Sequence, residues 1–474
     1  MNDKKNMTIG GIIAEYNIFH NGHKYQIDEF KRKFGISHLV VVISGNFTQR
    51  GGPSIIDKYS KTRACLDNGV DLVLELPTIF STQTAEIFSR GAVMTLDALS
   101  CVDYLCFGSE NGNISELKKI SDYVLTDEYN SLLKSYLDIK LPFPQAREKA
   151  IYNGIGACIE NINKPNNILG IEYLKELRRI SSKINPVTIK RQEVDHNSTE
   201  KIGKYASATS IRKDMMRVYD LYRREKIYDK IYSEIICEEL LEKNIDLKQK
   251  DILLEQKNIN QKRIREELYK ISKYLPSSSL EEINKSLSGD MVFMSEDVFS
   301  DEINYSILDK SSKLTEIFEV VEGLENSVVK SLVSSNSVSS LVAELTSKRY
   351  SSAKIRRMLY NILLDIDKEM IDSIKNAKRI PYIRVLGLNS KGGEILKKVK
   401  KNSEVYIIDK TSKVYKSQVY KENFLFKKIF DLDIKSSNMY YKKYYKNRID
   451  ILKNGSIDMV TSPIYKKDVY LKYL

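Results

Sequence analysis

Four short apolar runs, each followed by a helical pattern, constrain the fold of this chain more than any other feature of its sequence. The runs are Ile9–Ala14, His38–Ser44, Asp71–Leu76 and Asp103–Phe107. Strands that are apolar along their whole length are buried on both faces, and single helices between them indicate βαβ units. The pattern predicts an α/β domain with a parallel sheet. Ligands of such sheets bind beyond the carboxyl ends of the strands, so the loops after these runs are the expected site.

The second half of the sequence has a different character. The chain has 474 residues, and a single core rarely grows past about 250–300 residues, so at least two domains are expected. We assign residues 1–218 to a catalytic domain and residues 219–474 to a mainly α-helical, basic region. Helical spacing of apolar residues fills Tyr219–Tyr274 and resumes from Ser306 to Ala377. Two short strands are expected near the end: Ile380–Leu388 and Glu404–Ile408.

Positive charge is concentrated in the last third of the chain. Residues 342–474 hold 30 Lys and Arg against 14 Asp and Glu, a balance of +16, whereas the preceding residues hold 46 against 49, a balance of −3. Concentrated basic charge favours a polyanion partner, because each neutralised phosphate releases counterions. Charge alone leaves open a lysine-rich, solvated surface.

Membrane and disulfide classes are not favoured. The sequence has no apolar run of about 18 residues, so no transmembrane helix is expected, and the charged first residues do not resemble a signal peptide. The five cysteines form no CxxC pair, which argues against a zinc site or a disulfide framework: Cys65, Cys101, Cys106, Cys158 and Cys237. We therefore expect a cytoplasmic protein with no metal site of its own and no evident protein partner.

Two histidines follow the first strand with the spacing His20-Asn-Gly22-His23. A helix that begins there offers free N–H groups and a positive dipole end to an anion. Gly22 leaves room for a phosphate, and two imidazoles can donate hydrogen bonds to its oxygens. Such donors stabilise the negative charge that builds up when a nucleophile attacks the α-phosphorus of ATP. A structural pair of histidines is the alternative.

A second motif, Ser207-Ala-Thr209-Ser210-Ile211-Arg212, begins another predicted helix. Its hydroxyls, N–H groups and arginine can surround a phosphate. Taken alone, it is equally compatible with an ordinary helix cap. Together with the upstream histidine motif, it favours a nucleotide site.

These two motifs resemble the HxGH nucleotidyltransferase superfamily related to class I aminoacyl-tRNA synthetases. Further stretches narrow the resemblance to the tRNA(Met) cytidine acetate ligase family: SGNFTQRGGPSIIDKYSKTRACLDNGVDLVLELP, FGSENG, KPNNILGIEYL, EVVEGLE, SKRYSSAKIRRML and PYIRVLGL. The resemblance implies a Rossmann-like nucleotidyltransferase domain. It also implies that ATP and acetate form acetyladenylate, and that the acetyl group then passes to the wobble cytidine of elongator tRNA(Met), giving N4-acetylcytidine. Magnesium would arrive with ATP, because no acidic cage is visible.

The resemblance also implies the site residues. His20 and His23 would be catalytic, on the phosphates. The first ATP-binding segment would comprise Ile13, Ala14, Glu15, Tyr16, Asn17, Ile18, Phe19, His20, Asn21, Gly22, His23, Lys24, Tyr25 and Gln26. Further ATP contacts would be Gly108, Asn166 or Asn167, Arg191, Gln192, Ser207, Thr209 and Arg212. Three positions depart from the family pattern: Ile18 replaces the usual Pro, and Gly52 and Ser54 stand in QRGGPS where QRGEPA is usual.

Weaker candidates have two readings each. Five basic residues crowd one predicted helix and favour tRNA phosphates over a solvated face: Lys348, Arg349, Lys354, Arg356 and Arg357. Four tyrosines near the C-terminus could stack bases or pack as an amphipathic helix: Tyr440, Tyr441, Tyr444 and Tyr445. Asp71 and Glu75 could serve as paired carboxylates for metal or acid–base chemistry, although pairing with Lys or Arg is favoured. Gln49–Gly51 could face acetate or tRNA.

Alternative functions remain at this point. A small-molecule adenylyltransferase would need only the first domain, and the basic C-terminal region argues against it. A class I aminoacyl-tRNA synthetase would carry a KMSKS-like loop, where this chain has SATSIRK. A non-catalytic RNA-binding protein would not need the intact histidine motif.

Overall fold

The computed structural model describes residues 7–156, 162–191, 201–242, 247–452 and 456–467. An eight-stranded sheet lies at its centre, in the order β11–β10–β5–β2–β1–β6–β7, with β12 paired to β10. The strands of this sheet are β1 (Ile9–Ala14), β2 (His38–Ser44), β5 (Leu72–Leu76), β6 (Tyr104–Ser109), β7 (Asn185–Lys190), β10 (Tyr382–Leu388), β11 (Tyr406–Ile408) and β12 (Ile464–Tyr465). Two hairpins stand apart from it: β3 (Phe47–Thr48) with β4 (Gly52–Pro53), and β8 (Lys201–Ile202) with β9 (Tyr205–Ala206).

Five strands of the sheet run parallel to one another: β1, β2, β5, β6 and β7. This arrangement confirms the prediction of βαβ units. The strand order reverses at β1, because β2 pairs on one side of it and β6 on the other. Ligands of such sheets bind at this reversal, beyond the carboxyl ends. The helices that join these strands are α1 (Asn21–Phe34), α2 (Lys58–Asp67), α3 (Thr78–Ser81), α4 (Ala85–Asp97), α5 (Ile114–Tyr123), α6 (Asp127–Asp138), α7 (Phe143–Ile155) and α8 (Pro165–Arg179).

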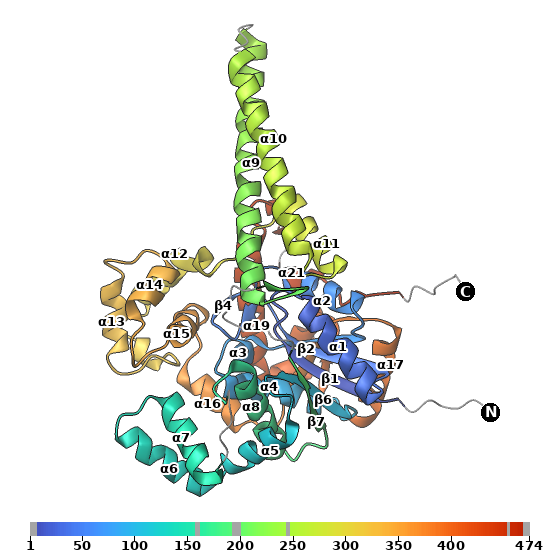
Figure 1. The fold of residues 1–474 in the computed structure, drawn as a ribbon, viewed down its shortest axis with the longest axis vertical. Coiled ribbons are helices and arrows are strands. Elements are labelled where there is room, and N and C mark those ends of the chain that lie inside the picture. Colours follow the sequence, from blue (N-terminus) through green and yellow to red (C-terminus); the bar gives the residue numbers. More distant parts are fainter. Residues whose placement is uncertain (1–6, 157–161, 192–200, 243–246, 453–455, 468–474) are drawn as a thin grey trace, which may run out of the picture.

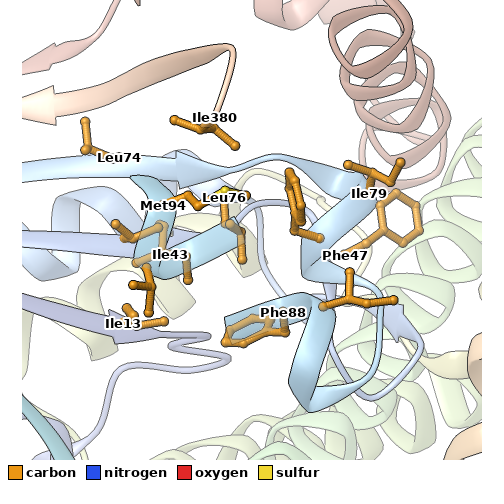
Figure 2. Close-up of a cluster of buried hydrophobic side chains, with 14 of the residues drawn as sticks. Ile13, Ile43, Phe47, Leu74, Leu76, Ile79, Phe88, Met94 and Ile380 are labelled. Atoms are coloured by element: carbon orange, nitrogen blue, oxygen red, sulfur yellow. The ribbon is translucent and has the colours of Figure 1, made fainter. Parts of the chain in front are cut away.

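Apolar side chains from both ends of the chain share one core. Figure 2 shows Ile13, Ile43 and Leu74 on neighbouring strands, with Phe88 packed near the carboxyl end of β1 and Ile380 above β5. All five are at most 7% exposed. The site is therefore built on strand ends that a continuous core holds in place.

The two halves of the chain meet in the central sheet. The C-terminal strand β10 pairs antiparallel with β5, so the sheet of the first domain is completed by residues from the second. A buried ionic network reinforces this junction: Lys58 Nζ lies 2.9 Å from Glu75 Oε1 and 2.8 Å from Asp458 Oδ2, and Arg384 Nη1 contacts the same two carboxylates at 3.2 and 3.0 Å. Glu75 is thus paired with Lys and Arg, as expected from the sequence.

Apart from β10, β11 and β12, the described part of the C-terminal half is mainly helical, which confirms the prediction of a mainly α-helical region. Its helices are α9 (Ala208–Glu242), α10 (Leu247–Ser272), α11 (Ser277–Ser288), α12 (Ser300–Asp309), α13 (Leu324–Ser331), α14 (Val338–Leu345), α15 (Ser352–Leu364), α16 (Lys368–Asn376), α17 (Ser390–Asn402), α18 (Gln418–Glu422), α19 (Phe424–Tyr444), α20 (Ile449–Leu452) and α21 (Ile457–Val460). Three short 3-10 helices, η1 (Glu296–Phe299), η2 (Leu314–Glu316) and η3 (Thr411–Lys416), lie between them. Among the described residues, no helix combines the length and the apolar character that crossing a bilayer needs.

Helices α9 and α10 form a long antiparallel arm that projects from the body of the molecule (Figure 1). A separate apolar cluster packs its base, with contributions from Ile18, Ile211, Met215 and Ile271. Because Ile18 belongs to the histidine loop and Ile211 to the second motif, the base of the arm joins the two predicted phosphate motifs.

Helix α19 buries three of the four C-terminal tyrosines. Tyr440, Tyr441 and Tyr444 are at most 1% exposed, and Tyr440 and Tyr444 stack with their ring centroids 5.5 Å apart. Bases cannot reach these three rings. The packed-helix interpretation of this segment therefore holds for them, and the base-stacking one does not.

Candidate active site

The two histidines cap helix α1 reciprocally. Nδ1 of His20 accepts the backbone N–H of Gly22 at 3.1 Å, and Nδ1 of His23 accepts the backbone N–H of His20 at 3.2 Å. A ring nitrogen that accepts a hydrogen bond carries no proton, so both rings hold their proton on Nε2. This cap therefore prepares two Nε2–H donors beside the positive end of the helix.

Packing fixes the orientation of both rings. The imidazoles stack with centroids 3.7 Å apart and an interplanar angle of 21°. Tyr16 and Phe19 contact the ring of His23 at centroid distances of 4.6 and 5.6 Å. His20 is 7% exposed. Donors held in this way need little reorganisation when charge develops on a phosphate.

Asn21 connects this motif to the base of the arm. Its backbone N–H donates to the carbonyl of Tyr274 at 3.0 Å, and its Nδ2 donates to the carbonyls of Lys204 and Lys273 at 3.1 and 3.0 Å. Asn21 thus holds the loop before α9 and the segment after α10 against the first turn of α1. Its role in the structure is to position the motif.

Two adjoining cavities, of about 180 and 50 Å³, lie at the carboxyl ends of β1 and β6. Both are lined by His20, His23, Gln26, Gly108 and Arg191. Of the predicted ATP-binding segment, ten residues line one cavity or both: Ile13, Ala14, Glu15, Tyr16, Asn17, His20, Gly22, His23, Tyr25 and Gln26. Four line neither: Ile18 and Phe19 are buried, Asn21 holds the arm, and Lys24 pairs with Asp28.

The second phosphate motif meets the first across the larger cavity. Arg212 donates from Nη1 to the carbonyl of Asn17 at 2.6 Å and from Nη2 to Thr209 Oγ1 at 3.1 Å. Burial and the neighbouring Arg50 lower the pKa of Arg212 to about 10, whereas Glu15 acts in the opposite direction. Ser207 Oγ accepts the backbone N–H of Ser210 at 3.1 Å and so caps α9. The fold brings together two motifs that lie about 190 residues apart.

The end of β6 and the start of α8 form the next wall. Glu110 accepts hydrogen bonds from Asn166 Nδ2 at 2.7 Å and from the backbone N–H of Asn167 at 3.0 Å. Asn166 also accepts from Arg191 Nη1 at 3.3 Å and lines the cavity, whereas Asn167 is fully buried. A side chain at Gly108 would meet Arg191 Cγ at 3.2 Å. Gln192 lies outside the described residues.

The loop after β2 closes one side of the cavity. Gln49 and Arg50 line it, and the backbone N–H of Gln49 donates to Glu15 Oε1 at 2.7 Å. Gly51 has a φ of 74°, and a Cβ there would lie 2.5 Å from the backbone nitrogen of Arg357 on α15. Helix α15 therefore packs directly on a loop of the site.

An apolar wall completes the cavity, and sequence reasoning did not identify it. Phe88, Phe107, Leu169 and Tyr173 line the larger cavity from α4, β6 and α8. Burial and the carboxylate of Glu15 raise the pKa of Tyr173, so its phenol stays protonated. The relevant signal was positional, because each of these residues lies where its element passes the carboxyl edge of the sheet.

The predicted tRNA-binding residues fall into two groups. Arg356 Nε contacts Glu296 at 2.6 Å, and Arg357 Nη2 contacts Glu319 at 2.7 Å, so both are ion-paired within the protein. Lys348 and Arg349 are exposed. The cations of Arg349 and Lys354 lie over the Tyr350 ring, 5.2 and 5.0 Å from its centroid. The two groups face different surroundings despite their proximity in sequence.

The described part of the chain contains no cluster of three or more His, Cys, Asp or Glu side chains that could hold a metal ion. Apart from the carboxylate of Glu15, the charged and ring-nitrogen groups of the cavity are donors: imidazoles, arginines and the N-termini of α1 and α9. This arrangement suits an anion such as a polyphosphate.

Comparisons with known proteins agree with this chemistry. A family model described as HIGH Nucleotidyl Transferase matches residues 7–453. A Thermoanaerobacter protein named tRNA(Met) cytidine acetate ligase is 38% identical over 432 residues, which cover 90% of this chain and 93% of that protein. A Clostridium perfringens protein of the same name is 34% identical over 446 residues, covering 91% and 94%. The crystal structure of Thermotoga maritima TmcAL bound with alpha-thio ATP superposes with a TM-score of 0.78, at 28% identity, over 98% of this chain and 100% of that one.

Proposed function

Since this chain belongs to the HIGH nucleotidyl transferase family and, within it, to the tRNA(Met) cytidine acetate ligases, we propose that it activates acetate with ATP and acetylates a tRNA cytidine. The observation that carries the proposal is the pair of Nε2–H donors on His20 and His23, which face Thr209 and Arg212 across one cavity.

The first half-reaction would use these groups directly. A carboxylate oxygen of acetate attacks the α-phosphorus of ATP, the bond from that phosphorus to the leaving oxygen breaks, and pyrophosphate departs. His20, His23 and Arg212 stabilise the charge on the phosphate oxygens. Gly108, Asn166 and Arg191 lie where they can contact the nucleoside. Magnesium would be carried by the phosphates of ATP, because it commonly binds through substrate phosphates with few protein carboxylates.

The second half-reaction would transfer the acetyl group to N4 of the wobble cytidine of elongator tRNA(Met). The exposed Lys348 and Arg349, together with the half-buried Lys354, support a tRNA contact surface on and before α15, since basic and aromatic groups together suit a single-stranded RNA loop. The other two predicted residues, Arg356 and Arg357, would fix α15 through Glu296 and Glu319, and the backbone of α15 at these residues packs against Gly51 of the site loop. We propose that the protein works in the cytoplasm, where its tRNA substrate is found.

Two assays test the proposal. Acetate-dependent exchange of pyrophosphate into ATP, measured without tRNA, reports acetyladenylate formation. Radiolabelled acetate, ATP and bulk tRNA, followed by nucleoside analysis, report the transfer. We expect exchange with acetate and label in N4-acetylcytidine. Exchange without acetate, or with a small-molecule acceptor in place of acetate, would point to an adenylyltransferase instead.

A further inference from the structure

Glu15 places a carboxylate in a cavity that is otherwise built for anions. It follows the end of β1 and lines the same cavity as His20 and Arg212. A negative charge near a bound triphosphate is unfavourable, so phosphate binding does not explain this residue. The neighbours of Glu15 include the protonated phenol of Tyr173 and the cation of Arg212. The negative charge of Glu15 acts to raise the pKa of both groups.

The position of Glu15 is fixed from two sides. One carboxylate oxygen, Oε1, accepts the backbone N–H of Gln49 at 2.7 Å. Lys61 Nζ donates to the backbone carbonyl of Glu15 at 3.3 Å and to those of Ser44 and Gly45 at 2.7 Å each. Lys61 is fully buried and so ties the ends of β1 and β2 together. Among the residues that the structure describes, no donor contacts the second oxygen, Oε2.

The transfer step requires a proton acceptor at this place. When N4 of cytidine attacks the acetyl carbonyl, the nitrogen keeps two hydrogens and becomes positively charged, and one proton must leave to give the amide. The exocyclic amine is a weak nucleophile because its lone pair is shared with the ring. A carboxylate is a natural acceptor for cytosine N4–H and an effective general base when it lies within hydrogen-bond reach.

We propose that Glu15 accepts a hydrogen bond from N4 of the target cytidine and takes its proton during acetyl transfer. This inference rests on the proposed function. In the step, the C–N bond forms, the bond from the acetyl carbon to the phosphate oxygen breaks, and AMP leaves with that electron pair. The proton moves from N4 to a carboxylate oxygen of Glu15. Glu15 is then a catalytic residue of the second half-reaction.

The test is the variant Glu15→Gln, whose amide oxygen can still accept from the Gln49 N–H. Three rates are measured: acetate-dependent exchange, trapping of the acetyl group by hydroxylamine, and transfer to tRNA. Hydroxylamine is a strong nucleophile that needs no base. We expect transfer to fall by about 100- to 10,000-fold, and to fall at least about tenfold more than exchange or trapping, because only transfer needs a base at N4.

The matched control is Glu110→Gln, which alters the other carboxylate near the cavity. Glu110 accepts hydrogen bonds from Asn166 and Asn167. In Glu110→Gln we therefore expect a higher KM for ATP in exchange. Transfer should slow only in proportion to the reduced formation of acetyladenylate. If Glu15→Gln melts at a lower temperature, Glu15→Asp keeps the charge but withdraws it by one methylene. Transfer should then fall while exchange persists.

The outcomes separate this inference from the proposed function. A wild-type protein without acetate-dependent exchange contradicts the proposed function. Wild-type exchange and transfer together with normal transfer by Glu15→Gln overturn only the assignment of Glu15. Equal losses in exchange, trapping and transfer overturn it as well, because they would show that Glu15 positions ATP or its magnesium ion.

Discussion

At the scale of single residues, the histidine cap combines a structural and a chemical task. The same ring that accepts a backbone N–H through Nδ1 presents Nε2–H to the cavity. Replacement of His23 by Ala therefore removes both, and a variant that separates them is informative.

His23→Ala is expected to lower acetate-dependent exchange by about 100- to 1,000-fold and to cost about 0.5–2 kcal/mol of stability through the lost cap. His23→Gln should recover much of the stability, because Gln at this helix position can accept the same backbone N–H. It should not recover the rate. Exchange kinetics and melting temperatures of both variants check this. Near-normal exchange by His23→Gln would show that the ring donor is dispensable.

Lys61 gives a pH-dependent prediction at the same scale. Burial lowers its pKa from 10.5 to about 8, so between these values the unfolded chain binds more protons than the folded one. Stability linked to this group therefore rises with pH across that window. Relative to Lys61→Met, the wild-type protein should gain about 2 kcal/mol between pH 8 and pH 10. Denaturant unfolding of both proteins measures the difference, and a difference that stays constant with pH would contradict the lowered pKa of Lys61.

At the scale of secondary-structure elements, helix α15 serves two surroundings with one run of basic residues. Its buried side pairs Arg357 with Glu319 and rests on Gly51 of the site loop. Lys348 and Arg349, just before it, face solvent. The helix thus connects a candidate tRNA surface to a loop that lines the larger cavity.

We consider a triple variant, Lys348→Ala, Arg349→Ala and Lys354→Ala. It should bind tRNA more weakly, and the slope of log affinity against log salt concentration should become less steep by about one unit for each lost phosphate contact. Exchange without tRNA should be unaffected, because these side chains do not line the cavity. Titration of tRNA affinity against salt measures the effect. If the tRNA affinity and its salt dependence are unchanged, these three side chains form only a solvated surface and do not contact tRNA.

Arg357→Ala is the contrasting change on the same helix. It leaves the carboxylate of Glu319, 7% exposed, without its partner, and breaking a buried pair costs about 3–5 kcal/mol. We expect a lower melting temperature and weaker exchange, because the loop with Gln49 and Arg50 loses support. A variant with normal stability but weaker tRNA binding would instead place Arg357 on the tRNA surface.

At the scale of the whole molecule, the sheet makes the two halves of the chain interdependent. Strand β10 covers the edge of β5, and Arg384 and Asp458 complete the buried network around Lys58 and Glu75. Without residues 380–474, the apolar edge of β5 would be open to other chains, and Lys58 and Glu75 would lose two partners.

A fragment of residues 1–379 is therefore expected to aggregate or to unfold without a cooperative transition. Full-length Asp458→Ala should keep its fold but lose about 3–5 kcal/mol of stability. Its exchange should persist at temperatures below its transition, because Asp458 does not line the cavity. Size-exclusion chromatography and thermal unfolding check both proteins. A soluble, cooperatively folding fragment with exchange activity would contradict this interdependence.

The local parts of this protein were predictable from its sequence. The parallel strands β1, β2, β5 and β6 follow from apolar runs, and the two phosphate motifs follow from strand–loop–helix patterns, because each depends on residues that are neighbours in the chain. The position of Ser207, Thr209 and Arg212 at the start of a helix is of the same kind.

Only the tertiary structure decided the rest, because burial and ion pairing depend on residues far apart in sequence. It placed Asn166 at the cavity and Asn167 in the core, buried Tyr440, Tyr441 and Tyr444, and paired Arg357 with Glu319. It also joined β10 to β5 across more than 300 residues. A strand pattern in the sequence indicates that a segment pairs with the edge of some other strand. Which strand that is depends on the long-range pairing that buries the most apolar surface and leaves every buried charge paired.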